Sequence, residues 1–249
     1  MIDVAIEAAK AAGQLALGYF KNLPRVTYKA DKSPVTTADI EAEKLIRKII
    51  TKNFPDHGII GEELKNINQK AKYQWVIDPI DGTRDFIRQN PFWCTLVAVL
   101  EEKKPIIGVC YYPHRNELFS AQIGKGAYFN GKKTYVSKVE NLNQAYVNIS
   151  SAHHFSSIKK TGQLLTLSNS VGASRYLSSY GYAFLWTGHA DAVVVARGSI
   201  WDWAAPSVIT EEAGGKFSDF NGGNSLDSGT AIFSNGLLHD QVLKILNSK

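Results

Sequence analysis

The chain has 249 residues, 44% of them hydrophobic and 20% charged, which is enough to bury a substantial core in one large domain or two small subdomains. The formal net charge is only +5 and no dense basic block occurs, so nucleic-acid binding is possible but unsupported. The longest uncharged apolar stretch, 92–100, is too short to span a bilayer, and the N-terminus lacks a signal-peptide pattern, so we expect a soluble, cytoplasmic protein without a membrane partner.

Two helices and then a series of strands are predicted for the first part of the chain. Apolar residues recur at a helical period over 2–21 and again over 38–53. Four apolar runs that follow predict strands, at 74–78, 93–101, 105–112 and 118–121. Asn130 and Gly131 are typical of a hairpin turn, and Cys94 and Cys110 are expected to be buried free thiols. Residues 1–140 therefore predict an α+β subdomain.

Strands and helices alternate in the remainder of the chain. Strands are predicted at 145–150, 192–195 and 231–234. Helices are predicted at 155–168, at 178–187, from about 202 to 214, and at 237–246. The pattern indicates an α/β subdomain over 141–249, and because no low-complexity linker separates the halves, we expect them to pack closely.

Carboxylates stand at the ends of several of these elements. Glu62 and Glu63 follow a short apolar stretch, Asp78 and Asp81 end the strand that begins at Gln74, and Asp202 opens a helix. Taken singly, they are readily explained as a solvated loop, a turn and a helix N-cap. Taken together, they are carboxylates that distant parts of a chain can bring to one place, where they would repel one another unless a cation compensates them.

The chemistry of these side chains favours a hard cation. All-oxygen ligand sets suit Mg²⁺, Ca²⁺ or Mn²⁺, whereas the chain has no His/Cys set spaced for zinc, and the adjacent His153 and His154 are predicted to lie in a loop. Gly82 allows close approach of the backbone, and Thr83 is predicted to begin a helix, whose N–H groups could bind an anion. A cation site beside an anion site predicts phosphoryl chemistry.

Six motifs follow one another over nearly the whole chain: KADKSPVTTAD (29–39), GEE (61–63), WVIDPIDGTRDF (75–86), GVCYYPHRNELFSAQIGKGAYFNGKK (108–133), WDWAAPSVITEEAGG (201–215) and SNGLLHDQVL (234–243). With them the chain resembles the inositol monophosphatase family of Mg²⁺-dependent, lithium-sensitive phosphatases. The resemblance implies a layered αβαβα sandwich of the inositol monophosphatase and fructose-1,6-bisphosphatase type, usually homodimeric. Residues 1–140 would then carry most metal ligands, and 141–249 would supply Asp202 and the substrate pocket.

The resemblance also implies two or three Mg²⁺ ions, for which Mn²⁺ is a possible substitute. Glu62, Asp78 and the carbonyl group of Ile80 would hold one ion. Asp78, Asp81 and Asp202 would hold a second, and Glu62 would help to hold a weaker third.

Catalytic and phosphate-binding roles follow from the same resemblance. Thr83, with Asp39 behind it, would orient the attacking water, and Glu62 would act with them through its ion. Backbone N–H groups of Gly82 and Thr83 would bind the phosphate. Glu63 would reach the site from the second shell, through water.

The substrate is less well defined. KxDxSPVTxAD, FWCTLVAVL and SNGLLHD are most similar to histidinol-phosphate phosphatase-like members, which leaves the subfamily unresolved. Both those members and the inositol monophosphatases tend to carry a glutamate seven residues before the last metal aspartate, where this chain has Val195. Arg197 lies nearby and could hold a second anionic group or be a solvated surface residue. Arg175, Tyr176 and Tyr180 are further candidates for the pocket. Arg84 and Arg88, which follow the metal loop, could guide anions toward it or simply be solvated.

The expected activity is therefore hydrolysis of a small-molecule phosphate monoester by metal-activated water. Inositol 1-phosphate and histidinol phosphate are the main candidates, followed by fructose 1,6-bisphosphate and 3′-phosphoadenosine 5′-phosphate. A role of another class, in which the same fold binds RNA or protein as a regulator, is the alternative.

Overall fold

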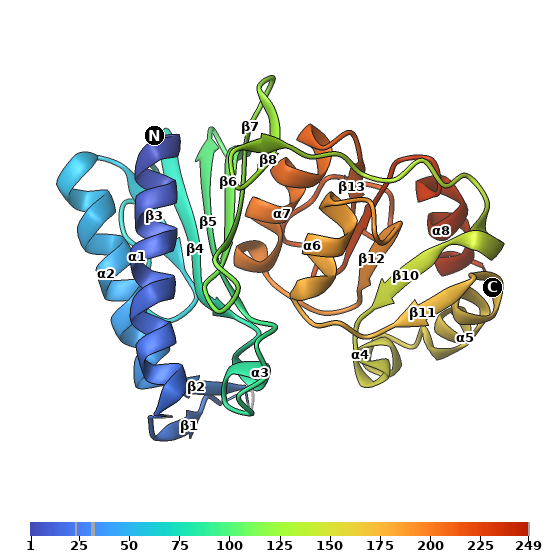
Figure 1. Ribbon diagram of the computed structural model, residues 1–249, viewed down its shortest axis with the longest axis horizontal. Helices are drawn as coiled ribbons and strands as arrows, with labels where there is room; N and C mark the ends of the chain where they lie inside the picture. Colours follow the sequence, from blue (N-terminus) through green and yellow to red (C-terminus); the bar gives the residue numbers. More distant parts are fainter. Residues whose placement is uncertain (23, 31–32, 249) are drawn as a thin grey trace.

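The computed structural model describes residues 1–22, 24–30 and 33–248 and arranges them in five layers, helix, sheet, helix, sheet, helix (Figure 1). This confirms the predicted αβαβα sandwich. The seven-stranded sheet is built from residues before 134 and the five-stranded sheet from residues after 145. A division into subdomains at about residue 140 remains a prediction, because helices of the second half pack on the first sheet.

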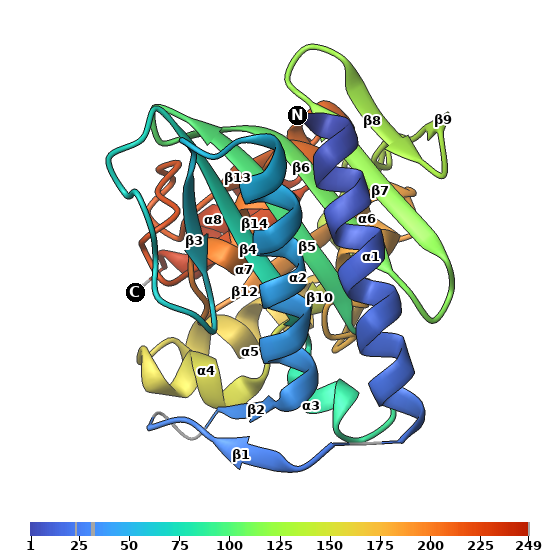
Figure 2. The ribbon, with the colours of Figure 1, turned by 90° about the vertical axis from the view of Figure 1, so that its left-hand side faces the viewer.

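The first layer consists of α1 (Ile2–Lys21) and α2 (Thr37–Asn53), which lie side by side over one face of the large sheet (Figure 2). The buried face of α1 is made mostly of alanine, which lets the helix approach the strands closely. A short antiparallel ribbon, β1 (Val26–Tyr28) with β2 (Pro34–Thr36), joins the two helices.

The large sheet runs in the order β3-β4-β5-β6-β7-β8-β9. Its strands are β3 (Gly58–Gly61), β4 (Tyr73–Asp81), β5 (Cys94–Glu101), β6 (Lys104–Tyr112), β7 (Glu117–Gln122), β8 (Gly126–Phe129) and β9 (Lys132–Lys133). β3 and β4 are parallel, and the other neighbouring pairs are antiparallel. The hairpin predicted at Asn130 and Gly131 is confirmed, since both residues have positive φ, 47° and 79°, as a tight hairpin turn requires.

The middle layer contains α6 (Tyr180–Trp186) and α7 (Ile200–Glu212), between the two sheets. α7 lies close against β6 because Gly108 has no side chain: a Cβ atom there would stand 2.3 Å from the carbonyl oxygen of Ala205. This close contact matters for function, since the first turn of α7 carries Asp202.

The small sheet and the outer helices complete the sandwich. The sheet has the order β11-β10-β12-β14-β13. β11, β10 and β12 are parallel to one another, and β14 is antiparallel to both of its neighbours, β12 and β13. Its strands are β10 (Tyr146–Ile149), β11 (Ala173–Arg175), β12 (Ala192–Val195), β13 (Lys216–Ser218) and β14 (Ala231–Ser234). The outer helices are α4 (Ala152–Ser157), α5 (Thr161–Ser170) and α8 (His239–Leu246), and short helices η1 (Leu142–Gln144) and α3 (Thr83–Phe86) lie in connections.

Two predictions about the region around residue 155 are wrong. The helix expected over 155–168 is two helices, because Lys159 has φ 59°, a left-handed conformation that a right-handed helix cannot contain. His153 and His154 lie within α4 rather than in a loop.

One local expectation, that for the two cysteines, agrees with the structure. Cys94 and Cys110 are buried free thiols. His239 of the SNGLLHD motif is fully buried, and its ring nitrogens lie 2.8 Å from the hydroxyl groups of Ser218 and Ser234. Burial lowers the pKa of His239 to about 4, so this histidine joins two strands as a neutral group. In the described part of the chain, no helix combines the length and apolar character needed to cross a bilayer.

Candidate metal and phosphate site

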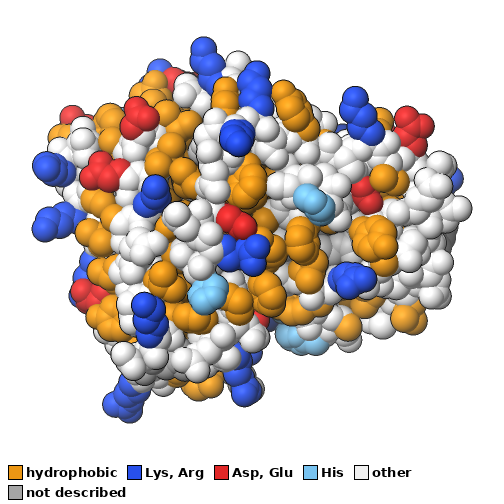
Figure 3. Space-filling view, in the orientation of Figure 1, with side chains coloured by type: hydrophobic (Ala, Val, Ile, Leu, Met, Phe, Trp, Pro, Cys, Tyr) orange, Lys and Arg blue, Asp and Glu red, His pale blue; other side chains and the backbone are white. Residues whose placement is uncertain are grey.

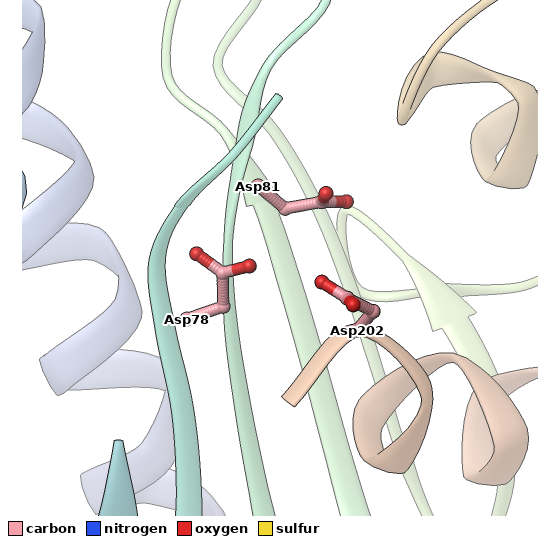
Figure 4. Close-up of side chains that lie close together, drawn as sticks. All are labelled: Asp78, Asp81 and Asp202. Atoms are coloured by element: carbon pink, nitrogen blue, oxygen red, sulfur yellow. The ribbon is translucent and has the colours of Figure 1, made fainter. Parts of the chain in front are cut away.

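Three aspartates from distant parts of the chain meet where the two halves pack together. Asp78 and Asp81 come from the end of β4, and Asp202 comes from the first turn of α7 (Figure 4). Each contributes an oxygen atom to a cluster whose oxygens all lie within 4.8 Å of one another. We call these three residues the aspartate cluster.

The backbone of β4 explains how both of its aspartates reach the cluster. β4 pairs regularly with β5 as far as Asp78, after which the register shifts before Asp81 pairs with Cys94. Such a bulge rotates the following side chains and often marks a functional site. The hydroxyl group of Thr95 donates a 2.9 Å hydrogen bond to the carbonyl group of Pro79 and so holds the bulge in place.

Asp202 and Asp39 are oriented in the same way, each by a capping box. Asp202 is the third residue of α7, and its Oδ2 accepts a 2.6 Å hydrogen bond from the N–H group of Ser199. Asp39 is the third residue of α2, and its Oδ2 accepts a 2.7 Å bond from the N–H group of Thr36. The prediction that Asp202 is itself an N-cap is therefore wrong, because Ser199 occupies that position.

Burial and mutual repulsion make the charged form of the cluster costly. Burial, followed by the charges of Glu62 and Asp81, raises the pKa of Asp78 well above its ordinary value. Burial and Asp81 do the same to Asp202, and burial raises the pKa of Asp81 to about 6. Without a bound ion, the three carboxyl groups of the aspartate cluster resist ionisation. A hard divalent cation prefers oxygen ligands of this kind, and its charge would restore the carboxylate form.

Glu62 lines the same cavity as Asp81 and Asp202 but is ion-paired with a lysine in this structure. Nζ of Lys29 lies 2.8 Å from Glu62 Oε1 and 2.7 Å from Glu63 Oε1. Burial alone would lower the pKa of Lys29, but the two glutamates outweigh it and raise that pKa overall. Burial, and secondly the charge of Glu62, raise the pKa of Glu63 to about 7. Lys29 was not identified as a site residue from the sequence, and Asp31 and Lys32 of its motif lie outside the described residues.

A buried glutamate that sequence reasoning missed holds the loop with Glu62 and Glu63. The Glu43 carboxylate accepts hydrogen bonds from the N–H groups of Glu63 (2.8 Å) and Leu64 (3.1 Å) and pairs with Arg47 at 2.7 Å. Gly61 permits this contact, since a Cβ atom there would stand 2.2 Å from Glu43 Oε1. The spacing of Glu43 and Arg47 by four residues on α2 is the only feature in the sequence that indicates the pair.

Thr83 lies between Asp39 and the carbonyl group predicted to bind metal. Its hydroxyl oxygen is 3.1 Å from the Ile80 carbonyl oxygen and 3.4 Å from Asp39 Oδ1. Asp39 is fully buried, and burial raises its pKa to about 6. Gly82, with φ 95°, precedes the helix α3 that starts at Thr83, as expected, and a Cβ atom there would stand 3.0 Å from the hydroxyl oxygen of Ser179.

A cavity of about 250 Å³ opens beside the cluster. Among the predicted substrate residues, Arg197 and Tyr176 line it, whereas Arg175 and Tyr180 do not. Arg175 lies over the ring of Tyr146, and the Tyr180 hydroxyl group is 2.7 Å from Glu117 Oε2. Side chains that also line the cavity include Arg84, Ser150, His154, Ser178, Tyr182, Val195 and Trp203.

A larger groove of about 870 Å³ lies elsewhere, between β5, α7 and the loop after β13. It contains none of the predicted site residues. The smaller cavity is therefore the one that chemistry at the aspartate cluster would use.

Comparison with known proteins gives consistent results over the full length. A model of the inositol monophosphatase family matches residues 1–249. A histidinol-phosphatase of Mycobacterium tuberculosis is 32% identical, over 98% of this chain and 97% of its own length. A fructose-1,6-bisphosphatase/inositol-1-monophosphatase of Thermotoga maritima is 33% identical, over 99% of this chain and 95% of its own. Among solved structures, the extragenic suppressor protein suhB of Bartonella henselae superposes with a TM-score of 0.91 at 27% identity, covering 99% of this chain and 98% of its own.

Proposed function

Because the chain belongs to the inositol monophosphatase family of phosphatases, we propose that it hydrolyses a phosphate monoester of a small metabolite in a reaction that requires divalent metal ions. The observation that carries the metal requirement is the aspartate cluster, whose oxygens come from two distant segments and lie within 4.8 Å of one another. Metal-dependent hydrolysis is the chemistry that such a cluster supports best, given that the relatives are phosphatases.

The residues around the cluster would share the ions between them. Asp78, Asp81 and Asp202, with Glu62 and the carbonyl group of Ile80, would hold two or three Mg²⁺ ions, and Mn²⁺ could substitute. When bound, such ions neutralise charge on the phosphoryl group and lower the pKa of the attacking water. Glu62 Oε1 is ion-paired with Lys29 at 2.8 Å, and the second oxygen of the same carboxylate could bind an ion at the same time.

Thr83 would orient the attacking water. Its hydroxyl group lies within reach of two acceptors, Ile80 and Asp39, and donates its proton to one of them. Its oxygen then presents a lone pair to a water molecule in the cavity, and Asp39 behind it sets that orientation. Backbone N–H groups of Gly82 and Thr83 would bind the phosphate, and Glu63 would act through water.

The relatives' names determine which esters to test first. Histidinol phosphate and inositol 1-phosphate lead, followed by fructose 1,6-bisphosphate. 3′-Phosphoadenosine 5′-phosphate is added from the family resemblance alone. Inhibition by Li⁺ and a cytoplasmic homodimer are further expectations from the family resemblance. In the part of the chain that the structure describes, no observation favours the alternative RNA- or protein-binding role over hydrolysis. On the face shown in Figure 3, Lys and Arg side chains are scattered among other side chains.

The test is phosphate release from this panel of esters with Mg²⁺, with and without Li⁺, by the parent protein and by Asp81→Asn. We expect Mg²⁺-dependent release that Asp81→Asn loses while it keeps its fold. Near-normal release by the folded variant would refute the assignment of the cluster, and no release from any ester would count against the phosphatase proposal.

A further inference from the structure

One wall of the cavity is cationic. Arg84 follows Thr83 in α3, and Arg197 lies in the turn between β12 and α7, five residues before Asp202. Both line the cavity with His154. Burial, and then the charges of His153, Arg197 and Arg84, lower the pKa of His154, so both guanidinium groups act on the same part of the wall.

Two buried nitrogen atoms of cavity-lining side chains also lack a partner. Trp203 is fully buried, and its indole Nε1 has no hydrogen-bond partner among the described residues. The buried Nδ1 of His154 has none there either. A buried N–H donor without an acceptor costs about 1–3 kcal/mol, and a ligand oxygen that reached the Trp203 indole would remove that cost. Nδ1 of His154 donates or accepts according to its tautomer.

Among the described residues, the acidic side chains of the cavity are those already assigned to metal ions. These carboxylates are Glu62, Asp81 and Asp202. Val195 also lines the cavity, at the position where family members tend to have a glutamate. The described part of the lining therefore offers no further carboxylate to pair with an ammonium or imidazolium group of a substrate.

We propose that the substrate carries a second anionic group, a carboxylate or another phosphate, which Arg84 and Arg197 bind while the metal ions hold the phosphate that is cleaved. The indole N–H group of Trp203 donates to an oxygen atom of the same substrate. This inference rests on the proposed function and narrows it to esters such as sugar bisphosphates and phosphorylated hydroxy acids. Histidinol phosphate, with its cationic end, is then a poorer substrate.

The test compares esters that differ only in the second group. Fructose 1,6-bisphosphate is paired with fructose 1-phosphate, and 3-phosphoglycerate with glycerol 3-phosphate, so the two pairs separate a second phosphate from a carboxylate. Histidinol phosphate and inositol 1-phosphate are the cationic and neutral references. With Mg²⁺ present, we expect kcat/KM to be at least about tenfold higher for the member of one pair that carries the second anionic group.

Variants then show whether the arginines are responsible. Arg84→Gln and Arg197→Gln should each lower kcat/KM for the preferred ester by about ten- to a hundredfold, mainly through KM. For the matched ester that lacks the second anionic group, kcat/KM should change by less than about twofold. Trp203→Phe should also weaken binding of the preferred ester. Arg88→Gln is the matched control, since Arg88 is exposed and does not line the cavity.

The possible failures can be told apart. Equal kcat/KM within both pairs, or arginine variants that affect both members equally, would overturn the second-anion inference and leave the phosphatase proposal standing. Hydrolysis of histidinol phosphate above all other esters would overturn it as well. The absence of hydrolysis of every ester by the folded, Mg²⁺-loaded protein would overturn both proposals.

Discussion

Replacing Asp81 by Asn should have opposite effects on stability with and without metal. In the metal-free protein burial raises the pKa of Asp81 from 3.8 to about 6. A carboxyl group with a raised folded pKa stabilises the fold below its unfolded pKa, and this contribution is lost as pH rises through the folded value. At pH 7.5 the ionised Asp81 side chain therefore lowers the free energy of unfolding by about 2 kcal/mol, after an allowance for its partial exposure.

Asp81→Asn should therefore be more stable than the parent by about 2 kcal/mol at pH 7.5 in EDTA, which raises the melting temperature by about 4–8 °C. The difference should shrink as pH falls towards 4. With Mg²⁺ at a hundred times its Kd, the parent should gain about 3 kcal/mol and the variant much less.

Thermal melting of both proteins in EDTA and in Mg²⁺, over this pH range, measures all three effects. Asp227→Asn, which removes an exposed charge outside the cavity, is the control. The reasoning would be refuted by a variant that melts below the parent in EDTA at pH 7.5 and still gains as much from Mg²⁺.

Three further changes test other parts of the site and fold. In Gly108→Val, a Cβ atom would stand 2.3 Å from the Ala205 carbonyl oxygen, so α7 should move away from β6. The free energy of unfolding should fall by about 2 kcal/mol and phosphate release should be lost. An unchanged melting temperature and unchanged activity would contradict this. Thr83→Ala should lower kcat by about 10²–10⁴ with little change in KM, and a change confined to KM in steady-state assays would contradict its catalytic role. His239→Asn should remove a pH dependence of stability. Because the pKa of His239 is lowered from 6.5 to about 4, the free energy of unfolding of the parent should fall by up to about 3 kcal/mol between pH 7.5 and pH 4, relative to that of the variant. Urea unfolding curves that give parallel pH profiles for the two proteins would refute this.

The long periodic elements were predictable because their patterns are local. Three elements have the bounds expected from the sequence: α1 (Ile2–Lys21), β12 (Ala192–Val195) and β14 (Ala231–Ser234). Three-residue edge strands such as β1 and β13 were not predicted, because so few residues carry no measurable period and their pairing is decided by neighbours. The break at Lys159 was missed because no glycine or proline marks it.

The same contrast holds for the site. Asp78, Asp81 and Asp202 could be predicted to converge because each stands at the end of a strand or the start of a helix. Glu43 and Lys29 could not, since their roles depend on tertiary contacts with the loop at Glu62 and Glu63. Arg175 and Tyr180 are close in sequence to cavity residues but point to other partners, which sequence proximity alone does not reveal.

The central claim is that carboxylates from the two halves of the chain bind divalent ions. It is tested most directly by anomalous diffraction from a crystal of the protein soaked with Mn²⁺. We expect anomalous peaks within about 2–2.5 Å of carboxylate oxygens of Asp78, Asp81 and Asp202, and the loss of the peak shared by Asp81 and Asp202 in Asp202→Asn. A map of the Mn²⁺-soaked parent with no peak at these aspartates would contradict it.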